Sequence, residues 1–407
     1  MKRVVGSVSA SEALAAPAAL PAPAALADPS FADDLIAWQK IHGRHTLPWQ
    51  NTTDAYRIWL SEIMLQQTQV AAVVPYYLKF LLRFPDVGTL AVAPTEEVMA
   101  HWSGLGYYSR ARNLHRCAQQ VVARYGGVFP ADPALLAELP GIGRSTAAAI
   151  SAFAYGTRAA ILDGNVKRVF ARVFGIDSYP GERQTEEQLW QRAVALLPPT
   201  GVEAYTQGLM DLGATLCTRA RPRCERCPLA GRCVALATGR VAELPVRKPK
   251  KAIPQKYVAM LVVIDAGQVL LMQRPDSGIW GGLLSLPELD GFSLTAPEAA
   301  ATTASTTSTT STTSTNRATG DAARLLLAAV GDVGSCAALL AFTHGFTHFK
   351  LQVTPYRITL SRRTPGVAQA GMVWLDAARI GDAALPAPVK KLLLALLGPD
   401  DLFASAH

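Results

Sequence analysis

Four cysteines lie close together in one short basic segment, "CTRARPRCERCPLAGRC", at residues 217–233. They follow the spacing C-x6-C-x2-C-x5-C and are Cys217, Cys224, Cys227 and Cys233. Four thiolates can hold a zinc ion tetrahedrally or an iron–sulfur cluster, and the spacing alone does not decide between the two. Six cysteines in 407 residues are too few for a secreted disulfide scaffold, so their grouping indicates a metal or cofactor site in a reducing compartment.

The region that begins with these cysteines is strongly basic. Residues 217–256 contain eleven lysines and arginines but only two acids, Glu225 and Glu243, which gives a local net charge of +9. A structured loop with this charge predicts contacts with the phosphate backbone of a nucleic acid. The alternative is an ordinary solvated face, because runs of like charge are often no more than that.

A second motif, "LPGIGRSTAAAI" at 139–150, also suits phosphate. Gly141 and Gly143 permit a tight turn that leads into a helix. The backbone amides of Gly143, Arg144 and Ser145 then lie at the positive end of that helix, where a phosphate oxygen can bind. The alternative is a plain turn between two helices.

Two carboxyl groups are candidates for acid–base chemistry. Glu62 lies in "WLSEIMLQQTQV" (59–70), a mostly apolar helical pattern that is expected to raise the pKa of its carboxyl group, as a general acid requires. The alternative for Glu62 is a solvent-facing side chain beside three glutamines. Asp163 lies in "ILDGNVKRVFAR" (161–172), where, taken in isolation, it reads as an ordinary helix N-cap.

The elements that must position these residues are helices in the first part of the chain and strands in the second. Residues 31 to about 235 show helical periodicity, with helices expected at 31–42, 55–74, 95–104, 111–126 and 144–156. From about residue 240 the pattern changes. Strands are expected at 257–265 and 269–274, as a hairpin, and within 339–360 and 371–376, before a closing helix at 387–398.

This order of expected helices and strands predicts an all-helical domain followed by an α+β domain. The expected segments are a disordered Ala/Pro-rich extension at 1–29, a helical domain at 30–238, a basic linker at 239–256, an α+β domain at 257–398 with a low-complexity insert at 300–316, and a tail at 399–407. No apolar run is long enough to cross a membrane. A pI of about 9.2 favours a polyanionic partner.

Together with "LPWQ" (47–50) and "GLGYYSRARN" (104–113), these motifs resemble those of the MutY-type adenine DNA glycosylases, over about residues 31–398. The resemblance implies a helix–hairpin–helix domain of the endonuclease III-like superfamily, followed by a Nudix-like α+β domain. It also implies that the four cysteines hold a [4Fe–4S] cluster, and that the cluster holds the arginine-rich loop toward DNA.

The resemblance also implies the catalytic roles. Glu62 is expected to protonate N7 of a flipped-out adenine, which makes the base a neutral leaving group. Asp163 is expected to stabilise the oxocarbenium ion of the sugar, and Asn165 to order the catalytic water. The base must leave the helix first, because its glycosidic bond is not reachable inside the stack.

Further residues take DNA-binding roles through the same resemblance. Leu47 and Trp49 are expected to line the adenine pocket. Gln67 and Tyr107 resemble the residues wedged into the duplex beside the lesion, where Thr68 also belongs.

One position bears on the type of reaction. Bifunctional members of the superfamily carry a lysine just after the hairpin, which attacks the sugar as an amine and nicks the strand. Ser145 occupies that position, and a hydroxyl group cannot form a Schiff base. The sequence therefore predicts a monofunctional glycosylase, with weak nicking through nearby Lys167 left open.

The second domain resembles a Nudix fold through "VLLMQRPDSGIWGGLLSLPE" (269–288). A Nudix hydrolase needs a run of glutamates for Mg²⁺, and residues 289–305 lack one, so the domain is expected to bind rather than hydrolyse. By resemblance it reads the 8-oxoguanine through His344, Thr347 and His348, although most relatives have serine at the position of Thr347. The alternative is that these histidines are ordinary strand residues.

The sequence therefore predicts a monofunctional, monomeric enzyme that removes adenine paired with 8-oxoguanine or guanine from double-stranded DNA. We expect it in the cytoplasm of a bacterium, at the nucleoid and not at a membrane. One alternative is a non-catalytic iron–sulfur protein that binds DNA, which the presence of both Glu62 and Asp163 disfavours. The other is a glycosylase/lyase for oxidised pyrimidines, which Ser145 and the second domain disfavour.

Overall fold

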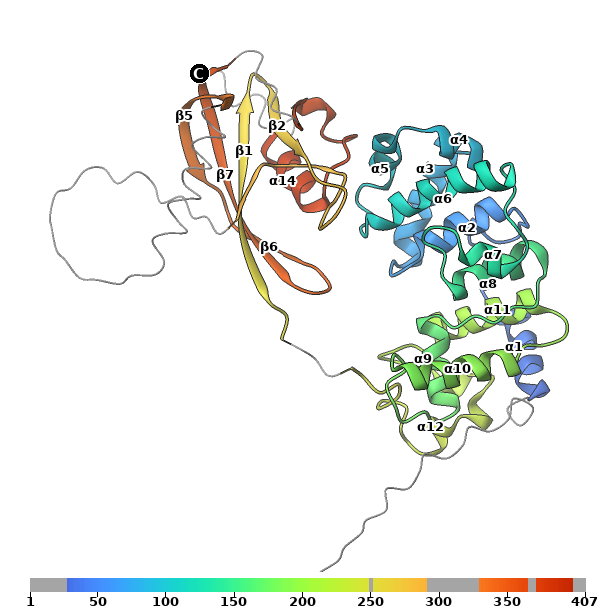
Figure 1. Ribbon diagram of the computed structural model, residues 1–407. Helices are drawn as coiled ribbons and strands as arrows, with labels where there is room; N and C mark the ends of the chain where they lie inside the picture. Colours follow the sequence, from blue (N-terminus) through green and yellow to red (C-terminus); the bar gives the residue numbers. More distant parts are fainter. Residues whose placement is uncertain (1–27, 249–251, 291–328, 365–370, 398–407) are drawn as a thin grey trace, which may run out of the picture. The chain divides into compact units, whose positions relative to one another are not determined.

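The computed structural model describes residues 28–248, 252–290, 329–364 and 371–397 (Figure 1). The insert predicted at 300–316 and the tail predicted at 399–407 lie outside the described residues. The same is true of the predicted N-terminal extension, except for its last two residues, and of Lys250 and Lys251 in the linker.

The chain divides into two compact units. Unit 1 comprises residues 1–45 and 151–248, and unit 2 comprises residues 46–150 and 249–407. Helices occur in both units, so the helical region predicted at 30–238 is shared between them. The domain boundaries expected from the sequence remain predictions.

Unit 1 is built from helices of both of its segments. They are α1 (Pro29–His42), α9 (Gly164–Val173), α10 (Arg183–Ala195), α11 (Val202–Asp211) and α12 (Val234–Ala237). The ring centroid of Phe31 on α1 lies 6.0 Å from that of Phe170 on α9 and 6.4 Å from that of Tyr205 on α11. Buried aromatic contacts of this kind join the first helix to helices that come much later in the sequence.

A π-helix, Leu212–Leu216, follows α11 directly and leads into the cysteine-rich loop. The loop contains two short 3-10 helices, Cys224–Arg226 and Ala230–Arg232. The π-helix packs closely on the start of α9, because a Cβ atom at Gly213 would lie 2.6 Å from the Cβ atom of Asn165. Only glycine permits this approach.

The helices of unit 2 are α2 (Ala55–Met64), α3 (Val70–Arg83), α4 (Val87–Val92), α5 (Thr95–Trp102), α6 (Ser109–Tyr125), α7 (Pro133–Ala137) and α8 (Arg144–Tyr155), whose last residues belong to unit 1. Their core contains the fully buried rings of Trp59, Phe80 and Trp102. The helices expected at 95–104, 111–126 and 144–156 are confirmed as α5, α6 and α8.

The continuous helix expected at 55–74 is wrong. Helix α2 ends at Met64 and α3 begins at Val70, and Gln67 between them has a left-handed backbone with a φ of 56°. The physical reason is a side chain from another helix. Arg110 donates hydrogen bonds to the carbonyl oxygens of Ile63 and Met64, which a continuing helix would need for its own next turn.

Unit 2 also contains a mixed sheet (Figure 1). The strands that the described residues form are β1 (Gln255–Asp265), β2 (Gln268–Gln273), β3 (Leu284–Ser285), β4 (Glu288–Asp290), β5 (Gly331–Ala338), β6 (Phe342–Gly345), β7 (Lys350–Arg363) and β8 (Met372–Asp376). The predicted hairpin is confirmed, since β1 and β2 pair antiparallel with Ile264 opposite Val269. Strand β1 pairs in parallel with β7, and the path through the sheet is β3-β2-β1-β7-β5.

The sheet core is apolar and includes Leu261 and Val263 of β1, Leu270 of β2 and Ile358 of β7. The predicted closing helix is confirmed as α14 (Ala387–Leu397), which buries Val389 and Leu393. Among the helices that the structure describes, none combines the length and the apolar character needed to cross a bilayer.

Candidate functional site

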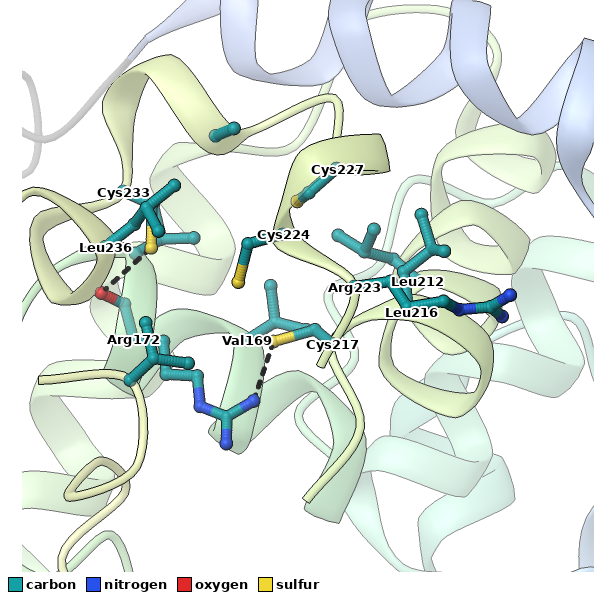
Figure 2. Close-up of a pocket in the computed structure, with 13 residues that line it drawn as sticks. Val169, Arg172, Leu212, Leu216, Cys217, Arg223, Cys224, Cys227, Cys233 and Leu236 are labelled. Carbon is teal, nitrogen blue, oxygen red and sulfur yellow. Dashed lines mark hydrogen bonds between the residues drawn. The ribbon is translucent and has the colours of Figure 1, made fainter. Parts of the chain in front are cut away.

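The four cysteines of unit 1 line a single pocket (Figure 2). Its empty volume is about 390 Å³, including its open mouth. The rest of the lining is mainly apolar and comes from α9, the π-helix and the cysteine loop; it includes Val169, Leu212, Leu216, Ala230 and Leu236. The fold therefore gathers the four thiols around one largely apolar pocket that is open on one side.

Arg172 of α9 holds the wall of this cysteine pocket. Its side chain is only 2% exposed. It donates to the Sγ atom of Cys217 at 3.4 Å, to the carbonyl oxygen of Thr218 at 2.8 Å and to that of Leu244 at 2.8 Å. Figure 2 shows the contact with Cys217 and the thiol of Cys233 directed at the backbone oxygen of Arg172. One guanidinium thus fixes the segments on both sides of the cysteines.

The thiols are set apart rather than converging on one point. No three His, Cys, Asp or Glu side chains among the described residues form a group that could hold a metal ion. Burial raises the pKa of the Cys227 thiol to about 11 and also raises the pKa values of Cys224 and Cys233. Deprotonation here calls for a positively charged ligand, and four thiols around one pocket suit a polynuclear group.

The arginines of the cysteine loop do not all face solvent. Arg232 forms ion pairs with Asp28 and Asp34, and Arg240 pairs with Asp177 and Glu243. Three of these acids, Asp28, Asp34 and Asp177, lie outside residues 217–256. The net charge of +9 for that segment therefore overstates the positive field that a partner would meet. The exposed arginines of the loop are Arg219, Arg221, Arg223 and Arg226.

Asp163 is the N-cap of α9, as its sequence position in isolation suggested. Its Oδ1 atom accepts hydrogen bonds from the backbone amides of Asn165 at 2.9 Å and Val166 at 2.8 Å, and its Oδ2 atom accepts one from the Asn165 side chain at 3.3 Å. Burial raises the pKa of the Asp163 carboxyl group, while these hydrogen bonds and the charge of Arg168 act in the opposite direction. The carboxylate is therefore fixed in orientation.

Arg168 connects this cap to the cysteine loop. It donates to the Oδ1 atom of Asn165 at 2.7 Å and to the carbonyl oxygen of Gly213 at 2.8 Å, and its Nε atom donates to the carbonyl oxygen of Cys217 at 2.8 Å. The Asn165 amide therefore has a defined orientation, with its nitrogen toward Asp163. Nearby Lys167 forms an ion pair with Glu186 at 2.8 Å.

In unit 2, Glu62 is half-buried on α2, between the buried residues Ser61 and Ile63. Of the residues expected in an adenine pocket, Leu47 is half-buried and Trp49 is buried. The ring centroid of Trp49 lies 5.3 Å from that of Tyr77 in an edge-on contact. Trp49 thus belongs to the core of unit 2, and its role toward a base stays a prediction.

Gln67 and Tyr107, the expected wedge residues, are both exposed and both have left-handed backbones, with φ values of 56° and 49°. Residues other than glycine rarely adopt this conformation, and it is often found at functional sites. Arg110 lies between their loops and also donates to the hydroxyl oxygen of Thr68 at 3.1 Å. The structure therefore brings Gln67, Thr68 and Tyr107 into one cluster.

The hairpin expected to bind phosphate lies between α7 and α8. Gly141 has a φ of 81°, and a Cβ atom there would lie 2.9 Å from the Cβ atom of Asn113, so glycine is required. Gly143 and Arg144 are exposed, and Ser145 is half-buried in the first turn of α8. The side chain of Gln66 donates to the carbonyl oxygen of Gly141 at 3.4 Å, which joins the hairpin to the loop of Gln67.

In the sheet, the three residues expected to read the lesion differ in exposure. His344 is half-buried, with its ring centroid 5.7 Å from that of Trp280 and 4.8 Å from that of Phe346, and burial lowers its pKa. Thr347 and His348 are exposed at the turn between β6 and β7. His344 therefore supports the turn, and the other two residues are accessible to a ligand.

Sequence reasoning missed the two buried arginines, Arg110 and Arg172. Both had a signal. Arg110 occupies the face of α6 that also carries Leu114, Cys117 and Val121, all of them buried. A charged residue in an apolar stripe is expected to have partners, because an unpaired buried charge is very costly.

Comparison with known proteins matches two separate stretches of the chain. The family described as "HhH-GPD superfamily base excision DNA repair protein" matches residues 60–194, and the family described as "NUDIX domain" matches residues 259–395. A protein named adenine DNA glycosylase from Buchnera aphidicola subsp. Acyrthosiphon pisum is 31% identical over 89% of this chain and 96% of its own length.

A protein of the same name from Mus musculus is 33% identical over 89% of this chain and 77% of its own length. Among solved structures, a thermostable thymine-DNA glycosylase is 30% identical, with a TM-score of 0.47, over 51% of this chain and 96% of that one.

Proposed function

The chain belongs to the adenine DNA glycosylase family, and from that membership we propose that it removes adenine paired with 8-oxoguanine or guanine in double-stranded DNA. The enzyme hydrolyses the N-glycosidic bond and leaves an abasic site. It works as a monomer on chromosomal DNA in the cytoplasm.

The observation that carries this proposal is the environment of Asp163. Its carboxylate is held by hydrogen bonds from Asn165 and Val166 and has an arginine, Arg168, nearby. A preorganised negative charge stabilises a cation that develops in the transition state, because no solvent has to reorganise as the charge appears. Departure of adenine generates such a cation on the deoxyribose.

Glu62 supplies the proton. Loss of adenine as an anion is unfavourable, so protonation at N7 lowers the barrier, and a positioned acid contributes about 10²–10⁴-fold to a rate. The half-buried position of Glu62 on α2 supports this role. Asn165, with its amide held by Arg168, positions the water that completes hydrolysis.

Extraction of the base falls to the exposed residues of unit 2. Gln67 and Tyr107 enter the duplex where the adenine leaves it, and the start of α8 binds a backbone phosphate. Ser145 in the first turn of α8 has no amine to attack the sugar, so the reaction ends at the abasic site without strand cleavage.

The four cysteines would hold a [4Fe–4S] cluster, which their arrangement around one largely apolar pocket supports. When bound, the cluster cross-links the loop through four thiolates. Cys217, whose carbonyl oxygen accepts from Arg168, then ties the loop to the start of α9. Arg219, Arg221 and Arg226 are exposed on this loop for contact with DNA phosphates.

The sheet recognises the base opposite the adenine. 8-Oxoguanine carries an oxygen at C8 and a hydrogen on N7, which guanine lacks. The Thr347 hydroxyl and the His348 imidazole are exposed and can donate or accept hydrogen bonds. A hydrogen bond of this kind is worth about 0.5–1.5 kcal/mol, enough for a moderate preference.

The decisive experiment is a single-turnover assay of the full chain on duplexes in which adenine faces 8-oxoguanine, guanine, cytosine or thymine. Free base and strand nicks are measured separately in each reaction. We expect release of adenine opposite 8-oxoguanine and guanine, fastest opposite 8-oxoguanine, and no nicking beyond that of the abasic product alone.

Two results would overturn the proposal. DNA binding without release of base from any duplex would indicate a non-catalytic DNA-binding protein. Release of oxidised pyrimidines with strand cleavage that borohydride traps would indicate a glycosylase/lyase.

A further inference from the structure

Two loops of unit 2 hold strained residues at their exposed ends. Gln67 lies in the segment between α2 and α3, and Tyr107 lies in the segment between α5 and α6. Each has a positive φ, which is unfavourable for a residue other than glycine. Such a conformation persists only where the surroundings enforce it, so something must hold both loops.

The contacts of Arg110 answer this requirement. Its Nη1 atom donates to the carbonyl oxygens of Ile63 at 3.0 Å, Met64 at 2.8 Å and Gln66 at 2.7 Å. These three oxygens belong to the end of α2 and to the residue directly before Gln67. The guanidinium therefore terminates α2 and fixes the entry to the first strained residue.

The second nitrogen reaches the other loop. Arg110 Nη2 donates to the carbonyl oxygens of Leu105 at 3.4 Å and Gly106 at 3.1 Å, directly before Tyr107, and to the Thr68 hydroxyl oxygen. Trp102 adds a hydrogen bond from its Nε1 atom to the Gly106 oxygen at 3.1 Å. One planar group thus bridges the residues that precede both strained positions.

Arg110 is 8% exposed and forms no ion pair with a carboxylate among the described residues. Backbone oxygens, the negative end of the α2 dipole and the rings of Trp102 and Tyr107 offset its charge instead. Burial lowers the pKa of Arg110 to about 10, which leaves it charged at neutral pH. Because both loops neutralise the same buried charge, Arg110 holds the two loops in a fixed position relative to each other.

We propose that Arg110 is the positioning residue of the DNA wedge: it sets Gln67 and Tyr107 in their strained, outward conformations before DNA arrives. This inference rests on the proposed function, since it assigns the wedge to adenine extraction. Lysine cannot replace Arg110, because an ammonium group on a flexible stem cannot bridge both loops in a fixed plane.

The test separates positioning from stability. Arg110→Lys is made in the full-length chain and also in a Gln67→Ala/Tyr107→Ala background. Arg124→Lys, an exposed arginine in the last turn of the same helix, is the matched control. Extrusion is read from the fluorescence of 2-aminopurine placed opposite 8-oxoguanine, with Glu62→Gln added to stop chemistry, and thermal unfolding is measured for every variant.

We expect Arg110→Lys to lower the extrusion rate on the order of 10²-fold, as a displacement of about 1 Å can do. In the background without wedge side chains, the same substitution changes the rate less than about threefold, because coupled residues are not additive. If Arg110→Lys lowers the extrusion rate equally in both backgrounds, or in neither, the positioning role of Arg110 is wrong. Wild-type protein that releases no adenine overturns the proposed function instead.

A second measurement needs no Arg110 variant and decides the matter if the substituted chain does not fold. Amide hydrogen exchange at residues 65–68 and 105–108 is followed in the wild-type chain, alone and with lesion duplex. Protection that is already present without DNA supports the proposal. Rapid exchange that becomes slow only with DNA means that the duplex, and not Arg110, orders the loops.

Discussion

The cysteine loop of unit 1 (217–233) and the two loops of unit 2 that carry Gln67 and Tyr107, here called the wedge loops, are irregular segments. A buried arginine anchors each region, but the two regions differ in the groups that this arginine holds. Arg110 has only polypeptide partners, and its hydrogen bonds already join the two wedge loops. Arg172 holds the wall of a pocket that four thiols line. The polypeptide alone holds the first region, whereas the second would be completed by the proposed cluster.

This difference teaches how each of the two units responds to damage. A substitution in the wedge loops changes geometry locally. Loss of the proposed cluster would remove a link between the thiols, and Cys217 and Arg168 connect that region to the cap of α9. Unit 1 is therefore expected to be the more fragile half of the enzyme.

The largest effect is expected from removing one carboxyl group in each unit. Glu62→Gln and Asp163→Asn should each lower the single-turnover rate of adenine release by about 10²-fold or more, because acid catalysis and charge stabilisation are separately lost. Binding of lesion duplex, measured by fluorescence anisotropy, should remain. Full activity in either variant would remove that residue from the mechanism.

Asp163→Asn has a second expected effect, on stability. The raised pKa of Asp163 means that folding disfavours its ionised form, so the carboxylate costs stability at every pH above that pKa. Asparagine caps a helix about as well and carries no charge. Thermal unfolding at neutral pH should therefore occur at the same or a higher temperature, with the advantage lost as pH falls below the unfolded-state pKa of about 3.9.

Cys224→Ser is the direct test of cofactor dependence. It should lower iron content, DNA affinity and solubility together, with affinity reduced by about tenfold or more as phosphate contacts are lost. Cys336→Ser, at an exposed cysteine in β5, is the matched control and should change none of the three. An iron-free but soluble variant that binds DNA normally would mean that the loop is ordered by the polypeptide, like the wedge loops.

A smaller effect is expected at Arg168, whose charge lowers the pKa of Asp163. Arg168→Met should raise that pKa further. Because Asp163 must be ionised for catalysis, the decrease in activity on acidification should then begin at a higher pH. Single-turnover rates across pH measure the shift, and Arg168→Lys, which keeps the charge, should restore most of it. Superimposable pH profiles for Met and wild type would rule out this coupling.

The smallest effect is expected at the exposed turn of the sheet. Thr347→Ser keeps the hydroxyl group and should change the preference for 8-oxoguanine over guanine by less than about twofold. Thr347→Ala combined with His348→Ala should reduce that preference by about tenfold, through the loss of hydrogen bonds. An unchanged preference in the double variant would place lesion recognition outside this turn.

Local patterns were sufficient to predict the sheet hairpin, the closing helices of the sheet unit and of the hairpin, namely α14 and α8, the helices α5 and α6, and the gathering of the cysteines. The break between α2 and α3 was not predictable, because apolar periodicity continues through 55–74 and the cause of the break, Arg110, lies far along the chain. The partners of Arg232 were missed for the same reason. Side-chain contacts over long separations leave no trace in local periodicity.

For Asp163, the sequence predicted the helix cap but not the contacts that orient its side chain. The position between an apolar stretch and a helix predicted a cap, and the cap is observed. Its orientation by Asn165 and Arg168 depends on the π-helix and the cysteine loop, which the sequence reading treated separately. A residue that serves as a cap can therefore also be fixed for chemistry by partners outside its own helix.

The packing of α1 on α9 and α11 has a consequence for how the chain is made. Unit 1 begins with α1 but is closed only by residues after 150, and Arg232 reaches back to Asp28 and Asp34 at its very start. During synthesis, α1 leaves the ribosome long before its partners, whereas the helices of residues 46–150 find one another sooner. The proposed cluster could be inserted only after Cys233 has emerged, and therefore later than α1 and the helices of residues 46–150.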